Sequence, residues 1–150
     1  MKKVLVGIDG SQASMNAVKY AARMAKLIGG EVVGINVINE PSYREYYKDI
    51  SDKLKKEAEE ILKKARVEVE KQGVMIKTRI DIGAPDDLLA EAAKTDQDVS
   101  MIVVGASGRG RGSRVFVGSK THALVNHMAA GLQCPVVVVP GTSEDFLKRL

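Results

Sequence analysis

The segment with the clearest chemical potential runs from position 104 to 121 and reads V-G-A-S-G-R-G-R-G-S-R-V-F-V-G-S-K-T. Its glycines at 105, 108 and 118 are separated by two and nine residues, and Ser119 follows the last. Glycine lets a ligand approach the backbone closely, and the N–H groups at a helix start favour phosphate. We therefore expect backbone N–H groups of residues 106–108 and 119, together with the Ser119 hydroxyl, to bind phosphate. A surface turn that only connects two elements is the alternative.

The elements around this segment alternate between apolar runs and amphipathic stretches. Apolar, β-branched runs predict strands at 3–8, 31–38, about 74–82, 99–104 and 135–139. Apolar stripes at helical spacing predict helices from the Ser11 cap to residue 28, at 52–72, from Pro85 onward, and from the glycine-rich segment to about 130. Residues 41–48 are predicted to form a loop. The glycine-rich segment thus leaves a strand and enters a helix.

Five strands that alternate with four helices predict one α/β domain over residues 1–150, ending in a polar tail at 141–150. The expected architecture is an open, Rossmann-like parallel sheet in the order 3-2-1-4-5 with helices on both faces. Ligands of such sheets bind outside the carboxyl ends of the strands, where the strand order reverses. Asp9 after the first strand and Gly105 after the fourth are both expected at that point.

Composition limits the classes of partner. The chain of 150 residues has 45% hydrophobic and 28% charged residues, a net charge of +4 and 4% aromatic residues. This charge is too small, and aromatic residues are too scarce, for nucleic acid to be the expected partner. No apolar stretch approaches the roughly 18–20 residues that span a bilayer, so we expect a cytoplasmic protein without a membrane partner. Cys134, the single cysteine, is expected to be a small buried side chain.

The spacing G-2x-G-9x-G-S resembles the nucleotide-binding signature of the universal stress protein family, in its ATP-binding branch. The resemblance extends from K-V-L-V-G-I-D-G-S near the start to C-P-V-V-V-V-P at 134–140. It implies an adenine nucleotide alpha hydrolase-like fold that binds ATP, or ADP or AMP, with Mg²⁺. It also implies a homodimer formed through the last strand, a role in the stress response, and an unidentified regulatory protein partner.

The resemblance assigns roles to particular residues. Asp9 would contact the nucleoside, although it could instead cap the first helix, and Val37 would cover the adenine, although any core valine fits the same pattern. Thr121 would lie near the terminal phosphates, whereas Lys120 departs from the apolar residue that related chains often have. The expected nucleotide-binding residues are Gly7, Ile8, Asp9, Val37, Val104, Gly105, Ser107, Gly108, Arg109, Gly118, Ser119, Lys120 and Thr121.

Neither the arginines between Gly108 and Gly118 nor the few candidate metal-binding residues decide which activity the protein has. Arg109, Arg111 and Arg114 either close over a triphosphate or lie in a solvated loop. His122 and His127 are five residues apart, about 140° around a helix, so we expect no metal pair. The pair Asp86-Asp87 is explained by a helix start.

No spacing indicates a catalytic residue. We expect a nucleotide-dependent regulatory protein with at most weak ATP hydrolysis. A slow ATPase or a nucleotidyl- or phosphotransferase using the same loop is the alternative, and an RNA-binding module built on the Arg-Gly cluster is a third.

Overall fold

The computed structural model of the chain describes residues 1–38, 48–106 and 119–150. Strands and helices alternate along these ranges. The strands are β1 (Lys3–Gly7), β2 (Glu31–Ile38), β3 (Ile76–Ile82), β4 (Val99–Gly105) and β5 (Val136–Val139). The helices are α1 (Gln12–Ile28), α2 (Lys48–Glu70), α3 (Pro85–Thr95) and α4 (Ser119–Ala129), followed by the 3-10 helix η2 (Asp145–Arg149).

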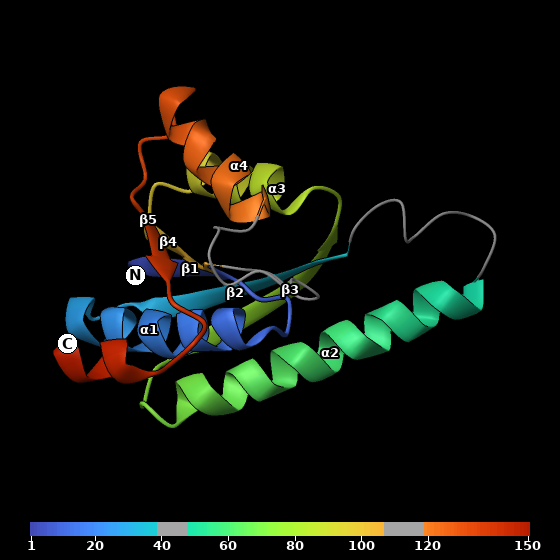
Figure 1. Ribbon diagram of the computed structural model, residues 1–150, viewed down its shortest axis with the longest axis horizontal. Helices are drawn as coiled ribbons and strands as arrows, with labels where there is room; N and C mark the ends of the chain where they lie inside the picture. The colour runs from blue at the N-terminus through green and yellow to red at the C-terminus, as the bar shows by residue number, and fades with distance from the viewer. Residues whose placement is uncertain (39–47, 107–118) are drawn as a thin grey trace.

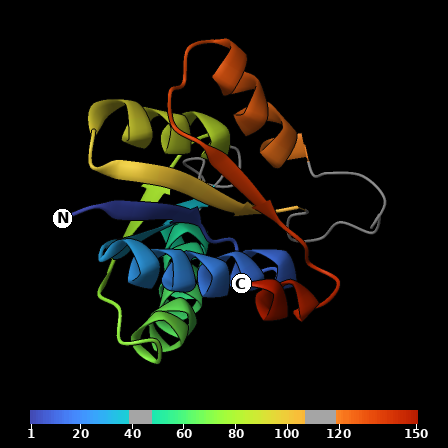
Figure 2. The same cartoon turned by 90° about the vertical axis from the view of Figure 1, so that its left-hand side faces the viewer.

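The strands form one parallel sheet in the order β3-β2-β1-β4-β5, which confirms the predicted topology. Helices α1 and α2 cover one face of the sheet, while α3 and α4 cover the other (Figures 1 and 2). Each face has its own apolar core, and both cores lie against β1, β2 and β4. Burial on both faces explains why the central strands are continuous apolar runs instead of alternating patterns.

Helix α1 shows how local sequence sets its two ends. Ser11 is extended and its hydroxyl accepts a hydrogen bond from the Ser14 N–H, which satisfies one donor of the first turn. Gly29 ends the helix in the left-handed conformation, with φ of 68°, where a side chain would be strained. The apolar stripe predicted for this helix is buried except at its last residue, Ile28, which is 40% exposed; its other members are Val18, Ala21, Ala22 and Ala25.

Two element boundaries differ from the sequence prediction. Helix α2 begins at Lys48, within the segment that we had predicted as a loop and four residues before the predicted start. Strand β3 begins at Ile76, two residues after the predicted start, because its pairing with β2 begins at Val32 opposite Ile76. No helix in the described ranges is both long and apolar enough to cross a membrane.

The polar residues after β5 pack against α1. The Asn16 side chain on α1 donates hydrogen bonds from Nδ2 to the Pro140 carbonyl at 2.9 Å and to the Ser143 carbonyl at 3.2 Å. The Tyr20 and Phe146 rings pack with their centroids 6.4 Å apart. These contacts hold η2 against α1, beside the C-terminus (Figure 2). The polar tail thus contains a short helix that packs on α1.

Cys134 lies at the entrance to β5 and is buried, as predicted. Burial raises the pKa of its thiol, and the Ile102 backbone only partly offsets that effect. A thiol with a raised pKa is a poor nucleophile at neutral pH. Cys134 therefore acts as a small core residue.

Candidate functional site

The carboxyl ends of β1 and β4 meet where the strand order reverses. Strands β2 and β3 continue the sheet on one side of β1, and β4 and β5 continue it on the other. Gly7 ends β1 and leads into Ile8 and Asp9, while Val104 and Gly105 end β4. The fold thus brings residues 7–9 and 104–105 of the expected site to the ends of neighbouring strands, and such a point is where ligands of open parallel sheets bind.

Asp9 shapes the turn between β1 and α1. Its Oδ1 accepts a hydrogen bond from the Ser11 N–H at 2.9 Å, and the side chain is half-buried. Ser11 itself supplies the side-chain cap of α1. The carboxylate therefore stands just before the helix cap, oriented by the turn.

The connection after β1 is also held from β2. The buried Asn36 side chain donates from Nδ2 to the Ile8 carbonyl at 2.8 Å, and the Ile8 N–H donates to the Ile35 carbonyl at 2.9 Å. Sequence reasoning gave Asn36 no role, although a polar residue within an apolar strand was a visible signal. The next residue, Val37, is half-buried and packs against the core on the α3 side of the sheet. Asn36 thus positions the chain that leads to Asp9.

Gly105 is required by packing, whatever it binds. A Cβ placed on it would lie 2.6 Å from the carbonyl carbon and 2.6 Å from the Cβ of Ala13, in the first turn of α1. The neighbouring Ala106 N–H, which we expected to face phosphate, instead donates to the Val139 carbonyl at 2.8 Å. That part of the prediction was wrong, because this N–H continues the pairing of β4 with β5.

The first turn of α4 is fixed to the end of β4. The buried Thr121 hydroxyl donates to the Gly105 carbonyl at 2.8 Å. Lys120 is exposed beside it. The helix start at Ser119 therefore lies close to the end of β4, as a strand-to-helix phosphate site requires.

The rest of the expected phosphate loop lies outside the described residues. This applies to Ser107, Gly108, Arg109, Arg111, Arg114 and Gly118, and to the side chain of Ser119. Their expected roles stay predictions.

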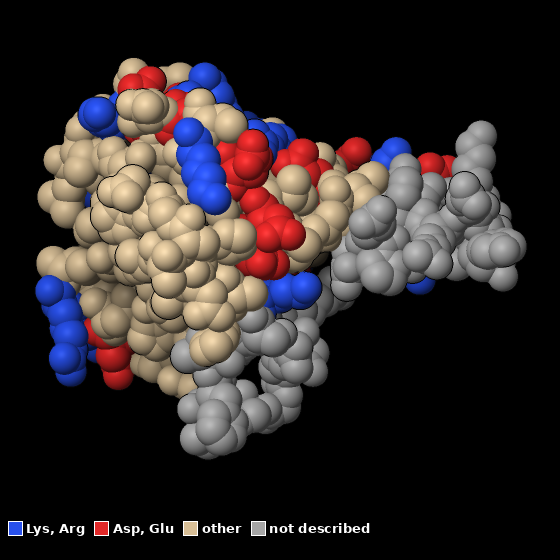
Figure 3. Space-filling view, turned by 90° about the horizontal axis from the view of Figure 1, so that it is seen from above, with Lys and Arg blue, Asp and Glu red and all other residues tan. Residues whose placement is uncertain are grey.

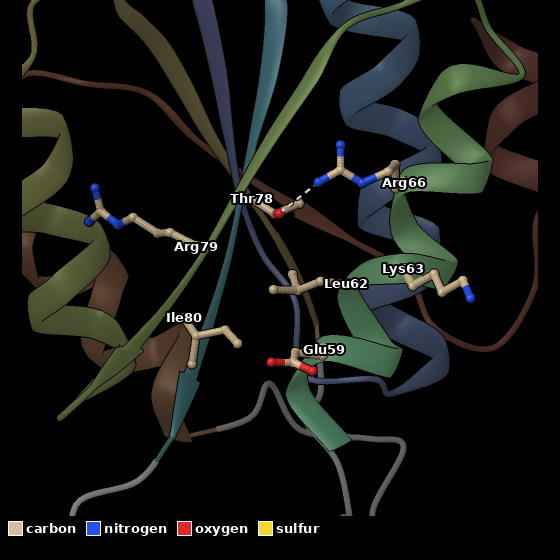
Figure 4. Close-up of a pocket in the computed structure, with 7 residues that line it drawn as sticks. All are labelled: Glu59, Leu62, Lys63, Arg66, Thr78, Arg79 and Ile80. Carbon is tan, nitrogen blue, oxygen red and sulfur yellow. Dashed lines mark hydrogen bonds between the residues drawn. The ribbon is translucent and has the colours of Figure 1, made fainter. Parts of the chain in front are cut away.

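A groove of about 290 Å³ lies elsewhere, between α2 and β3. Leu62 and Ile80 supply apolar side chains, and Arg66 donates to the Thr78 hydroxyl at 2.9 Å (Figure 4). Arg79 points to the other side of the strand, where its Nε lies 2.8 Å from Asp81 Oδ2. None of the expected site residues lines this groove, so it does not define the candidate site.

The sequence of this chain is similar to the sequences of known proteins. The profile of the family described as "Universal stress protein family" matches residues 1–140. The chain belongs to the universal stress protein family. A universal stress protein of Methanocaldococcus jannaschii is 32% identical over 143 residues, covering 92% of this chain and 81% of the relative.

Solved structures of universal stress proteins share the fold. The protein UspA of Lactobacillus plantarum is 26% identical with a TM-score of 0.78, covering 92% of this chain and 97% of its own. A universal stress protein in complex with cAMP is 23% identical with a TM-score of 0.69, covering 94% and 98% of the two chains. One from Archaeoglobus fulgidus in complex with dAMP is 20% identical with a TM-score of 0.70, covering 93% and 98%. At these last identities the likeness establishes the fold alone.

Proposed function

We propose that this universal stress protein binds ATP with Mg²⁺ and acts as a nucleotide-dependent regulator in the stress response, in the cytoplasm. One observation carries the proposal: Asp9 and Gly105, 96 positions apart in the sequence, stand at the carboxyl ends of adjacent strands where the strand order reverses. The glycine spacing that begins at Gly105 supplies a phosphate-binding pattern at the same place.

Two relatives of the same fold support the class of ligand. One was solved with cAMP and the other with dAMP, and both ligands contain adenine, a sugar and a phosphate. ATP has these three parts as well. A site built for them accommodates ATP if its phosphate end has room and donors for two further phosphates.

The residues divide between the two ends of the nucleotide. A carboxylate accepts hydrogen bonds from sugar hydroxyls or an adenine amine but repels phosphate, so Asp9 belongs at the nucleoside. Val37 offers apolar surface to the adenine, and Gly7 at the end of β1 and Ile8 just after it complete the nucleoside end in this proposal. The start of α4, with Ser119, belongs at the phosphates because its N–H groups and dipole favour negative charge. The proposed phosphate contacts of Gly108, Gly118 and Arg109 complete this end.

A homodimer through β5 is part of the proposal. Within the described residues, β5 pairs only with β4, so its outer edge is unpaired. Val138 on this strand is 38% exposed, and Val125 and Met128 on α4 are 40% and 45% exposed. An unpaired apolar edge favours association, and a second copy of the chain offers a matching edge.

The phosphate end of the site is tested with Gly118→Val and a matched control. A branched side chain at Gly118 should exclude a phosphate and weaken ATP at least about tenfold, which is about 1.4 kcal/mol. Gly112→Val places the same side chain in the same segment but outside the glycine spacing, so it should change the affinity less than about twofold. Titration calorimetry of the folded variants measures both. Equal affinities for the two variants would remove the glycine spacing from the site.

Turnover separates regulation from catalysis. Release of ADP or AMP at excess ATP should be slower than about one event per minute, far below typical enzyme rates. Faster turnover that Gly118→Val abolishes would instead favour the slow ATPase or transferase.

A further inference from the structure

The geometry points to a divalent transition-metal site formed by Asp86 and Asp87 at the start of α3 and His127 near the end of α4. The His127 Nε2 lies 3.3 Å from Asp86 Oδ2 and 3.1 Å from Asp87 Oδ1. The three ligand atoms lie within 4.8 Å of one another. None of these residues belongs to the proposed nucleotide site, so the inference stands independently of the proposed function.

Helix capping does not account for this arrangement. Acidic residues in the first turn are explained by the helix dipole, but that explanation involves no histidine from another helix. Consecutive residues point about 100° apart around a helix, yet Asp86 and Asp87 both reach the same imidazole nitrogen. That nitrogen carries either one hydrogen or one lone pair, so it forms a full hydrogen bond with only one carboxylate at a time. A cation placed between the three atoms would serve all of them.

The spacing and ligand types fit a small transition ion. Ligand atoms about 2.0–2.1 Å from a tetrahedral Zn²⁺ lie roughly 3.4 Å from one another, close to the two distances from His127. One imidazole and two carboxylates suit Zn²⁺ and its first-row neighbours better than Mg²⁺, which prefers oxygen ligands alone. Water would take the fourth position, because the Asp87 side chain is 67% exposed and leaves the site open.

The charge and burial of the three side chains also favour a divalent ion. The Asp86 and His127 side chains are only 15% and 23% exposed, so their carboxylate and imidazole are partly removed from solvent. The two carboxylates carry two negative charges, which a divalent ion neutralises. His127 also lies in the last turn of α4, where the helix dipole favours a positive charge. Acidic side chains gather on the face of the molecule where α3 and α4 lie (Figure 3).

A bound ion would join the end of α4 to the start of α3. Thr121 holds the first turn of α4 to β4, and His127 lies six residues further, roughly 9 Å along the helix axis. The two helices pack against each other, and Asp86 and Asp87 stand at the start of α3. Metal binding therefore fixes the end of α4 opposite to the one that follows the glycine-rich segment.

The experiment is a calorimetric titration of Zn²⁺ into the full chain, free of nucleotide and chelator. The expected result is saturable binding of one ion per chain, with a matching rise in the melting temperature. His127→Gln and Asp87→Asn should each weaken binding at least about tenfold. Asp87 is exposed, so its variant keeps the fold even if substitution at His127 does not. Circular dichroism checks both variants.

His122→Gln is the matched control. His122 lies on the same helix and is exposed, but it is not one of the three clustered ligand residues, so its variant should bind Zn²⁺ within about twofold of the parent. Three results would overturn the site: no saturable binding up to about 1 mM Zn²⁺, unchanged binding after Asp87→Asn, or an equal loss after His122→Gln.

Discussion

Gly105 and Asp9 each perform a structural task at the place where the nucleotide is proposed to bind. Gly105 lets the first turn of α1 approach the end of β4, and Asp9 orders the turn that begins α1. A substitution at either residue therefore changes stability as well as binding. Unfolding and ligand binding are therefore measured on the same variants, which separates a loss of stability from a loss of affinity.

Gly105→Ala should destabilise the fold even without nucleotide. The new Cβ would lie 2.6 Å from the Ala13 carbonyl carbon and 2.9 Å from its oxygen, so α1 must shift. Overpacking of this kind costs about 1–3 kcal/mol, which urea unfolding measures. Adding Ala13→Gly should recover little of the loss, because the conflict with the Ala13 backbone remains. Full recovery by the second substitution would show that only side chains conflict.

Asp9→Ala should weaken ATP, ADP and adenosine by similar factors, because the proposed contact is to the nucleoside that all three share. Asp9→Asn is the matched control, since an amide oxygen still accepts the Ser11 N–H and preserves the turn. Calorimetric titration of the two variants separates loss of the turn from loss of the ligand contact. A loss that grows with the number of phosphates would instead place Asp9 at the metal ion.

At the scale of elements, an ion pair joins the start of β1 to the end of α3. The Lys3 Nζ lies 2.6 Å from Asp96 Oδ2. This contact lowers the pKa of the Asp96 carboxyl, with a further contribution from the Asp98 N–H, and it raises the pKa of Lys3. Because the carboxyl pKa is lower in the folded chain, the unfolded chain binds the proton more tightly in acid. The stabilisation is present at neutral pH and is lost as pH falls through the lowered pKa.

Asp96→Asn should therefore reduce stability at pH 7 and leave less stability to lose between about pH 5 and pH 2. Urea midpoints measured across this range test the prediction. Asp98→Asn removes a neighbouring charge but not the contact with Lys3, so its acid dependence should stay closer to that of the parent chain. Parallel pH profiles for the parent and Asp96→Asn would show that the pair contributes nothing.

Local sequence patterns predict much of the fold, but they do not predict contacts between residues that are far apart in the sequence. The apolar stripe predicted for α2 is only partly buried. Of its members, Leu54 and Ile61 are half-buried, and the buried ones are Ala58, Leu62, Ala65 and Val69. By contrast, the Tyr20–Phe146 contact joins positions 126 apart, and the sequence around residue 146 is too polar to indicate burial. Nothing local indicates that η2 would pack on α1.

The candidate site likewise combines features that the sequence predicts with contacts that it does not. The glycine spacing and the strand order are readable from sequence, so the meeting of Asp9 and Gly105 could be predicted. The bond from Asn36 to Ile8 could not, because it depends on the register between β1 and β2. The contact of His127 with Asp86 likewise joins two helices through residues 41 positions apart.

At the scale of the whole molecule, two copies should meet at the edge of β5 that no other described strand pairs with. Val138→Lys adds a charge to that edge and should shift the protein from dimer to monomer, with some loss of melting temperature. Val67→Lys is the control, because Val67 is 50% exposed on α2, on the opposite face of the sheet from α4. Light scattering at micromolar concentration measures the molar mass of the parent chain and of both variants. A monomeric parent chain would contradict the proposed dimer.

The measurement that tests the central claim most directly is mass spectrometry of small molecules released from freshly purified protein. Our account predicts an adenine nucleotide, either retained at about one per chain or taken up when ATP and Mg²⁺ are supplied at about 1 mM. Protein that carries no nucleotide and takes up none under those conditions would contradict it.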